Sequence, residues 1–321
     1  MPIRTDENRA GEGGYPGSEL AVATRALTRR FGQVTAVGDL SLVVPRGSVY
    51  GFLGLNGAGK STTIRMLLGL IRPTSGNAAV LGLTIPQGRL RALGRVGALV
   101  EAPTVYPHLT GTENLKVTLR LLGARRKEVS RALEVVGLSD AAHRLVREYS
   151  TGMRQRLGLA LALVGEPELL ILDEPTNGLD PRGIQEVREL VCELPRRLGV
   201  TVFLSSHILA EVEQVANHVG IIHRGRLVVQ GALEELLQGG RLRVGVSDPV
   251  KARDFLAGLG RSARAGENGT LLVEALPGSD AATVNDILVR GGHPVSHLVY
   301  ERASLEQVFF GATSEPKEGD S

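Results

Sequence analysis

The stretch Gly54-Leu55-Asn56-Gly57-Ala58-Gly59-Lys60-Ser61 decides the fold of this chain. It fits the phosphate-binding loop, in which a glycine and four free positions precede Gly-Lys-Ser/Thr. The glycines let the backbone turn several N–H groups toward phosphate oxygens. Lys60 supplies a positive charge for the β- and γ-phosphates, and Ser61 supplies a hydroxyl group for the magnesium ion that accompanies a nucleoside triphosphate. A predicted buried strand over residues 49–53 and a predicted helix over residues 61–70 flank the loop in the required order, which argues against a chance match.

The bulk composition limits what the rest of the chain can be. Its 321 residues suggest more than one domain, and 42% hydrophobic residues are enough for a packed core. No apolar run is long enough to cross a bilayer. Residues 1–18 are polar and glycine-rich, so we expect a disordered leader or a mis-assigned start rather than a secretion signal. The single cysteine, Cys192, cannot form an intramolecular disulfide, which favours a reducing cytosol. A formal net charge of +3 is too small to argue for nucleic acid as a partner.

Polar residues follow two of the predicted buried strands. The apolar strand 169–173 ends in Asp173 and is followed by Glu174. Beside a phosphate loop, the first acid can hold hydrated magnesium and the second can orient or deprotonate water, whereas the alternative is a solvated carboxylate pair. His207 follows the predicted strand 200–205. A lone histidine is usually structural, but its place at a strand end in register with these acids favours the site.

Three further residues allow two interpretations each. Phe31, between predicted strands 21–27 and 39–44, can stack on a nucleobase, although taken alone it is better interpreted as a half-buried packing residue. Ser150 and the small residues after it precede a predicted helix over residues 156–164, as either a second phosphate site or an ordinary N-cap. Asp180-Pro181 predicts a helix start with aspartate as N-cap, and Pro195 is expected to end that helix.

Residues 101–122 combine an irregular segment with a helix. Glu101 opens the irregular segment 101–107, and Thr110 with Glu113 predicts a capping box that starts a helix ending near residue 122. A second helix is predicted over residues 127–136. The basic residues around these helices predict a solvated face or, less favoured, a docking surface for an acidic partner or lipid headgroups; they are Arg120, Arg125, Arg126, Lys127 and Arg131.

The C-terminal third has its own pattern after Gly239-Gly240, which we interpret as a domain boundary. Strand and helix signals alternate in the order β-α-β-β-α-β, with Asn268-Gly269 as a hairpin turn. This order is typical of the ferredoxin-like arrangement and carries no functional information. We therefore predict an accessory α+β domain over residues 241–311 and a disordered tail over residues 312–321.

With these pieces in order, residues 20–236 resemble the ATP-binding subunits of ABC transporters. Gly54–Ser61, continued by Thr62, matches the Walker A motif, and residues 169–173 with Glu174 match Walker B and the catalytic glutamate. Other matches are Phe31 at the adenine-stacking aromatic, Asp180 in the D-loop and His207 at the switch histidine. The signature position reads Ser150-Thr151-Gly152-Met153. The resemblance implies an α/β P-loop fold over residues 19–238, with an antiparallel β subdomain and a helical subdomain, and ATP and Mg²⁺ as cofactors.

Two departures from the family pattern bear on activity. Thr151 and Met153 replace a glycine and the glutamine of the usual Ser-Gly-Gly-Gln signature, while Ser150 and Gly152 remain. Glu101 stands where the family has a glutamine. A glutamate can still ligate magnesium, with Ser61 and Asp173, but it adds negative charge near the phosphates.

The resemblance also implies partners. Two copies of the subunit are expected to close head to tail around two ATP molecules, on the inner face of the cell membrane, beside a separately encoded membrane-spanning permease. Residues 101–115 resemble the bacterial exporters of bacitracin and lantibiotics, and residues 301–309 resemble daunorubicin-type exporter subunits. Two alternatives stay open: a non-transport ATPase acting on nucleic acid or the ribosome, and a regulatory subunit of low activity.

Overall fold

The computed structural model describes residues 19–123, 128–266, 269–275 and 280–313. The chain divides into two compact units, Met1–Gly231 and Ala232–Ser321, so the division falls a few residues before the predicted boundary at Gly239-Gly240. The predicted leader, 1–18, and most of the predicted tail lie outside the described residues, as do Arg125, Arg126 and Lys127. In the described part of the chain, no helix is both long and apolar enough to span a bilayer.

The first unit is built on a six-stranded sheet in the order β11-β10-β4-β9-β8-β7. Strands β10, β4, β9, β8 and β7 run parallel to one another. β4, β8 and β9 are buried along their whole lengths, as expected for a parallel sheet with both faces covered. The bounds are β4 (Val49–Leu53), β7 (Val96–Leu99), β8 (Leu169–Asp173), β9 (Thr201–Ser206), β10 (His218–His223) and β11 (Arg226–Ala232).

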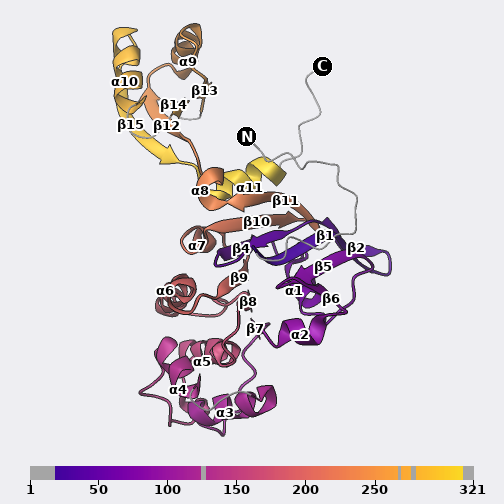
Figure 1. Ribbon diagram of the computed structural model, residues 1–321. Coiled ribbons are helices and arrows are strands. Elements are labelled where there is room, and N and C mark those ends of the chain that lie inside the picture. Colours follow the sequence, from indigo (N-terminus) through magenta and orange to yellow (C-terminus); the bar gives the residue numbers. More distant parts are fainter. Residues whose placement is uncertain (1–18, 124–127, 267–268, 276–279, 314–321) are drawn as a thin grey trace. The chain divides into compact units, whose positions relative to one another are not determined.

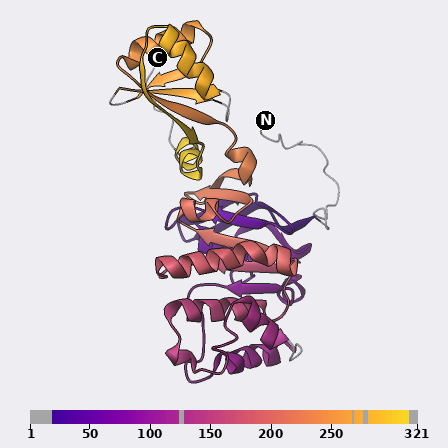
Figure 2. The same ribbon diagram turned by 90° about the vertical axis from the view of Figure 1, so that its left-hand side faces the viewer.

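Helices cover both faces of this sheet (Figure 1). On one side lie α6 (Pro181–Leu198) and α7 (Leu209–Glu213), and on the other lies α1 (Lys60–Leu67). Figure 2 shows α6 running across the sheet. The prediction that Pro195 ends α6 was wrong. The helix continues to Leu198 because its apolar face stays buried through Leu194, and Gly199, with φ of +68°, ends it by donating its N–H to the carbonyl of Pro195.

An antiparallel sheet stands beside the central sheet, in the order β2-β1-β5-β6 with β3 paired to β1. Two strands had been predicted over residues 21–44, but there are three, and the first reaches Phe31. β1 continues beyond its apolar pattern because the half-buried Arg29 and the exposed Arg30 still pair with β2, with irregularities in the register between Leu27 and Arg30. The bounds are β1 (Leu20–Phe31), β2 (Val34–Leu40), β3 (Val43–Pro45), β5 (Ser75–Val80) and β6 (Leu83–Ile85).

A helical subdomain is inserted between β7 and β8. It contains α3 (Gly111–Leu122), α4 (Glu128–Val135), the short 3-10 helix η1 (Val146–Glu148) and α5 (Thr151–Leu163). The predicted capping box is confirmed, because Glu113 N–H donates to Thr110 Oγ1 at 3.2 Å and Thr110 N–H donates to Glu113 Oε2 at 2.8 Å. Before β7, the sequence prediction missed the five-residue helix α2 (Arg89–Leu93).

The second unit has a four-stranded antiparallel sheet in the order β13-β14-β12-β15. Its elements follow the predicted order β-α-β-β-α-β, and its core includes Leu242, Val244, Leu256, Val284 and Leu288. The bounds are α8 (Leu233–Leu236), β12 (Gly240–Val246), α9 (Pro249–Gly258), β13 (Ala263–Ala265), β14 (Thr270–Ala275), α10 (Asp280–Arg290), β15 (Val295–Arg302) and α11 (Leu305–Thr313).

Glu168 ties the start of β8 to two neighbouring segments. Arg95 donates to both of its carboxylate oxygens, at 2.5 and 2.6 Å, and Arg46 donates to Oε2 at 2.9 Å. The hydrogen bonds from Arg95 lower the pKa of Glu168 from 4.5 to about 2. The carboxylate therefore stays ionised and bonded in the folded protein at pH values where an unfolded chain would protonate it.

We predict that Glu168→Gln lowers the free energy of unfolding at neutral pH by up to about 1 kcal/mol, since the pair is partly exposed to solvent. A depressed folded pKa gives stability that is present above the unfolded value and is lost as pH falls from 4.5 toward about 2. Urea unfolding of wild type and variant should therefore differ less at pH 3 than at pH 7 and converge as the pH approaches about 2. Glu193→Gln, which breaks an exposed pair with Arg197 on α6, is the control. An equal loss at pH 3 and pH 7 would contradict the assignment.

Candidate nucleotide-binding site

The phosphate loop connects β4 to α1 at the carboxyl edge of the central sheet. Gly57 and Gly59 have φ of +80° and +108°, a region that side chains disfavour. A Cβ atom on Gly54 would lie 2.5 Å from the carbonyl oxygen of Ile222, and one on Gly59 would lie 2.6 Å from that of Ala36. The glycines are therefore required both by the turn and by the close packing of the loop against β2 and β10.

The ammonium group of Lys60 is buried inside this loop. The residue is 5% exposed, and its Nζ donates to the carbonyl oxygen of Gly54 at 2.7 Å. Nζ also lies 3.1 Å from Oε1 of Glu174. Next to Lys60, Ser61 and Thr62 are half-buried in the first turn of α1, where backbone N–H groups have no partner within the helix. A positive charge and free donors thus converge where an anion can bind.

Two carboxylates follow the end of β8. Asp173 is 5% exposed and accepts a hydrogen bond from Ser205 Oγ at 2.5 Å. Glu174, with φ of +52°, donates its N–H to the carbonyl and hydroxyl oxygens of Ser205, at 3.2 and 3.1 Å. Its carboxylate bridges Lys60 and His207, whose Nδ1 lies 2.5 Å from Oε2. Groups from α1, β8 and β9 thus meet at one edge of the sheet, as the strand-end pattern predicted.

Sequence reasoning missed Ser205, which holds both Asp173 and the Glu174 backbone in place. The signal available in the sequence was a hydroxyl residue at the end of an apolar strand. The structure shows that Ser205 is completely buried there. The carboxylate and hydroxyl oxygens of this edge are ligands that suit magnesium, which in nucleotide sites takes one or two carboxylates together with phosphates. Among the described residues there is no group of three or more histidine, cysteine or acidic side chains that could hold a metal ion.

Glu101 and Phe31 make their contacts with other residues than this cluster. Glu101, with φ of +65°, is exposed, and its carboxylate accepts a hydrogen bond from Arg65 Nη2 at 2.5 Å. Arg65 lies one helical turn after Ser61 on α1, so Glu101 is ion-paired with a residue of the helix that follows the phosphate loop. Phe31 ends β1 and is 47% exposed, with the guanidinium of Arg29 lying 4.5 Å from its ring centroid. Its ring is thus available for stacking rather than buried in a core.

The signature residues cap a helix. Ser150 is the N-cap of α5 and accepts from the Met153 N–H at 3.2 Å, so the helix begins at Thr151 and not at Arg156 as predicted. The polar first turn of α5 carries no apolar pattern, which explains the error. From α5, buried Gln155 donates to the carbonyl of Pro175 at 2.6 Å and so links this helix to the segment after Glu174.

One open hollow of about 550 Å³ brings the signature and D-loop together. It is lined by Ser150–Met153 and by Asp180, which caps α6 by accepting from the Gly183 N–H at 2.9 Å. No Walker A residue lines it. The phosphate loop and the signature of one chain therefore face different spaces.

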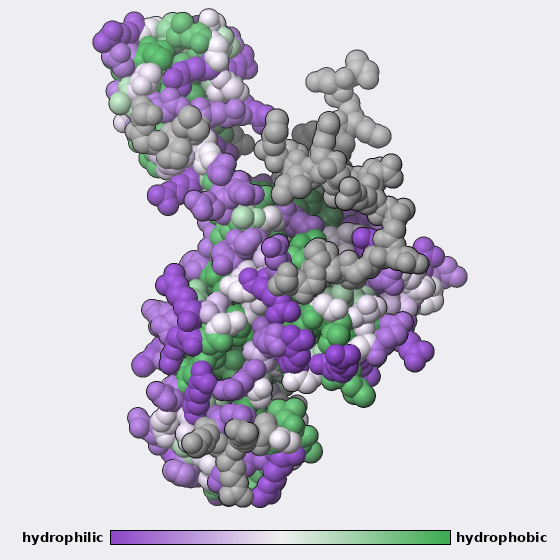
Figure 3. All heavy atoms as spheres, viewed as in Figure 1, coloured by the Kyte–Doolittle hydropathy of each residue, from purple (hydrophilic) through white to green (hydrophobic). Residues whose placement is uncertain are grey.

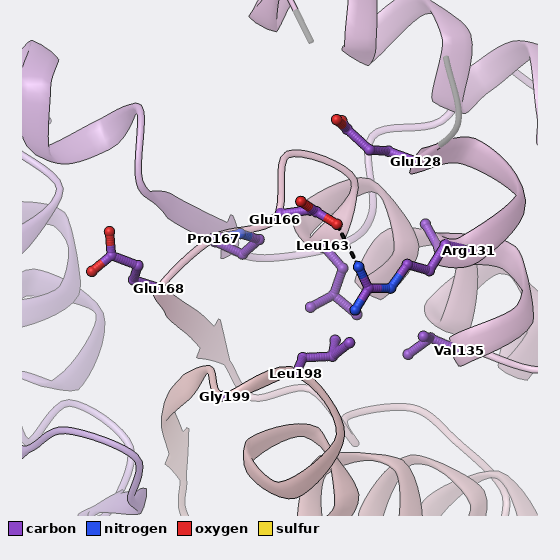
Figure 4. A pocket seen from close by; sticks show the side chains of 10 residues that line it. Glu128, Arg131, Val135, Leu163, Glu166, Pro167, Glu168, Leu198 and Gly199 are labelled. Carbon is purple, nitrogen blue, oxygen red and sulfur yellow. Dashed lines mark hydrogen bonds and ion pairs between the residues drawn. The ribbon is translucent and has the colours of Figure 1, made fainter. Parts of the chain in front are cut away.

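A second hollow, of about 300 Å³, lies away from these motifs between α4, the end of α5 and the end of α6 (Figure 4). Arg131 extends across it to Glu166, at 2.6 Å. This basic residue is thus exposed, as predicted, and is also ion-paired. None of the predicted nucleotide-binding residues lines this hollow.

A glycine loop at the carboxyl edge of a buried parallel sheet, with a buried lysine and acidic strand ends beside it, defines a P-loop nucleoside triphosphatase. The family model described as ABC transporter matches residues 37–177. Among curated relatives, the bacitracin transport ATP-binding protein BcrA of Bacillus licheniformis is 47% identical over 234 residues, which are 72% of this chain and 76% of that protein. The uncharacterised ABC transporter ATP-binding protein YdbJ of Bacillus subtilis is 37% identical over 94% of this chain and 98% of its own length.

Solved structures agree. The structure of cbiO1 from Clostridium perfringens, described as part of the ABC transporter complex cbiONQ, matches with a TM-score of 0.63 and 26% identity, and the match covers 68% of this chain and 90% of that one. This chain belongs to the ATP-binding subunits of ABC transporters. It is an ATP-binding ATPase, and the family resemblance predicted from its motifs is confirmed.

The Lys60–Glu174 ion pair has a consequence for nucleotide affinity. A nucleotide that places a phosphate at Lys60 competes with Glu174 for the ammonium group. We predict that Glu174→Gln binds ADP about tenfold more tightly, which corresponds to about 1.4 kcal/mol for releasing the partly buried pair. ADP is chosen because it cannot be hydrolysed at the γ-position, and calorimetry gives its affinity directly. Glu189→Gln, an exposed site on α6, should change nothing; unchanged or weaker binding to Glu174→Gln would contradict the competition.

Proposed function

We propose that this chain is the ATP-hydrolysing subunit of an exporter that moves an antibiotic, drug or peptide through a separately encoded membrane permease. The observation that carries the ATPase role is the contact of Glu174 with both Lys60 and His207 at the sheet edge. The export role rests on the 47% identity to a bacitracin transport ATP-binding protein. Such a subunit works on the inner face of the cell membrane, where ATP is available.

Binding of ATP follows from the loop. The backbone N–H groups of the glycine loop and the first turn of α1 surround the phosphates. The Lys60 ammonium group leaves the Glu174 carboxylate and pairs with the phosphates instead. Phe31 stacks on the adenine. Ser61 and Asp173 would hold Mg²⁺, which neutralises charge on the phosphates when bound. Glu101 is a third candidate ligand, and it would first have to leave Arg65.

Hydrolysis then uses the groups that ATP has displaced. Once Lys60 is occupied by phosphate, the Glu174 carboxylate is free to take a proton from the attacking water. His207, held by that same carboxylate, lies at the strand end where it can donate a hydrogen bond to the γ-phosphate. Ser205 keeps both acids in position through its hydroxyl and carbonyl groups.

The second half of the site comes from another copy. The signature lines a different space from the phosphate loop, through Ser150, Thr151, Gly152 and Met153. It is therefore suited to close over the nucleotide bound by a second subunit, because the positive N-terminal end of α5 would attract the γ-phosphate of that nucleotide. The altered Thr151 and Met153, and Glu101 in place of glutamine, favour a second candidate, a regulatory subunit of low turnover. A formal net charge of +3 gives the nucleic-acid alternative no support.

The permease contact is proposed at α2, the segment 101–107 and α3. Large hydrophobic side chains are exposed there, with Leu90 at 84% and Leu121 at 82% exposed and Tyr106 at 48%. Figure 3 shows hydrophobic side chains on the surface over α2 and beside α3. Isolated exposed residues need no explanation, but this grouping on neighbouring elements is suited to a partner.

Steady-state ATP hydrolysis tests the proposed function. We expect specific activity to rise with protein concentration, because each site needs a second copy, and to fall by about a hundredfold or more in Glu174→Gln, since a general base contributes at least that factor. Ser150→Ala should lose activity while keeping ADP affinity. Glu189→Gln serves again as the control. Wild-type turnover as slow as that of Glu174→Gln, with or without permease-containing membranes, would favour the regulatory alternative.

Phe31 gives an independent test of the adenine contact. Replacing it by alanine should weaken ATP binding by about 1–2 kcal/mol, the usual contribution of an aromatic stacked on a base. The same substitution should weaken binding of inorganic triphosphate much less, because that ligand has no base. Equal effects on both ligands, measured by calorimetry, would assign Phe31 to packing instead.

A further inference from the structure

The outer strand of the C-terminal sheet is open on one side. β15 pairs with β12 from Val295 to Arg302, and among the described strands none pairs with its other edge. At the opposite side of the sheet, β13 has only three residues. An unpaired edge exposes a row of N–H and C=O groups that can pair with another strand, and the longer edge is the stronger template.

β15 lacks the features that usually protect an edge. Proteins commonly place proline, lysine or a central bulge on such strands. Here the stretch 296–300 reads Ser-His-Leu-Val-Tyr, without proline or a permanently charged residue, and the only irregularity in the pairing lies at its start, near Ser296. Val299, in the middle of the strand, is 52% exposed. The edge is thus regular over residues 297–302 and carries no permanent charge over residues 296–300.

The strand is complementary to itself in one antiparallel register. If a two-fold axis passes through Val299, each Val299 faces its equivalent, and Leu298 faces Tyr300 of the second copy. In the same register His297 faces Glu301 of the second copy. Apolar pairs that face each other directly stabilise antiparallel strands, and a histidine ring can donate a hydrogen bond to a facing carboxylate. A shift of register by one residue would separate these pairs and place side chains from opposite faces together.

Two contacts within the unit hold β15 in place. Glu301 is held on its face of the sheet by Arg241 at 2.7 Å and Arg243 at 2.6 Å, so its carboxylate has a defined position. On the other face, α10 packs on β15 (Figure 1). The edge strand is therefore anchored from both faces of its own sheet.

We propose that β15 pairs antiparallel with β15 of a second copy of this chain, centred on Val299, to form a continuous eight-stranded sheet. This contact is distinct from the head-to-tail pair of the proposed function, because it needs neither nucleotide nor the signature residues. It would keep two C-terminal units together through the ATPase cycle and so raise the local concentration of the two nucleotide sites.

Sedimentation of the full chain without nucleotide tests the proposal. We expect a concentration-dependent dimer in wild type and at least a tenfold larger dissociation constant in Val299→Lys, because two lysines would face each other across the axis. Val250→Lys, on α9 of the same unit and 50% exposed, is the matched control and should dimerise like wild type. A monomeric wild type, or equal dimerisation of the two variants, overturns the proposal.

Cross-linking tests the register itself. In a Cys192→Ser background, Val299→Cys should form a disulfide-linked dimer under a mild added oxidant, because directly facing strand residues come close enough for a disulfide. Val250→Cys should remain uncrosslinked. Equal rates of cross-linking overturn the register. If Val299→Lys leaves sedimentation unchanged but reduces binding to permease-containing membranes, the edge belongs to the permease, and the second-copy proposal is wrong. None of these readings depends on ATP hydrolysis.

Discussion

The buried ammonium group of Lys60 is the constraint on which the rest of the nucleotide site depends. A charge that is removed from water must be paired and hydrogen-bonded, and here it has a loop carbonyl and the Glu174 carboxylate. That need explains why the glycine loop curls tightly and why the segment after β8 turns toward it through a residue with positive φ. An anionic nucleotide can take over this role, and phosphate binding would then release the Glu174 carboxylate.

The parallel sheet determines which residues meet at the nucleotide site. Strands β4, β8 and β9 lie side by side, so the residues that follow each of them reach the same edge. The phosphate loop, Glu174 and His207 come from these three strand ends, and Ser205 connects two of them. The signature helix α5 is attached elsewhere, through Gln155 and the segment after Glu174. In the proposed mechanism, this separation is the reason why a second copy completes each nucleotide site.

Most of the site could be predicted because its residues are fixed by local rules. A glycine loop between a strand and a helix, acids at a strand end and a capped helix are all short-range patterns. The errors arose where long-range contacts decided the outcome. β1 reaches Phe31 because β2 pairs with it beyond the apolar pattern, and α6 continues past Pro195 because its apolar face stays buried. Ser205 was missed because only burial distinguishes it from any other serine.

The sequence by itself determined the family, the phosphate loop, the acids and the histidine of the edge, and the order of strands and helices in the C-terminal sheet, since each depends on residue type and spacing along the chain. Only the tertiary structure decided that Glu174 joins Lys60 to His207, that Glu101 pairs with Arg65, and that the signature faces a different space from the phosphate loop. These are contacts between residues distant in the chain, whose distances depend on how the sheets and helices pack. The open edge of β15 belongs to the same group, because strand order is a property of the folded sheet.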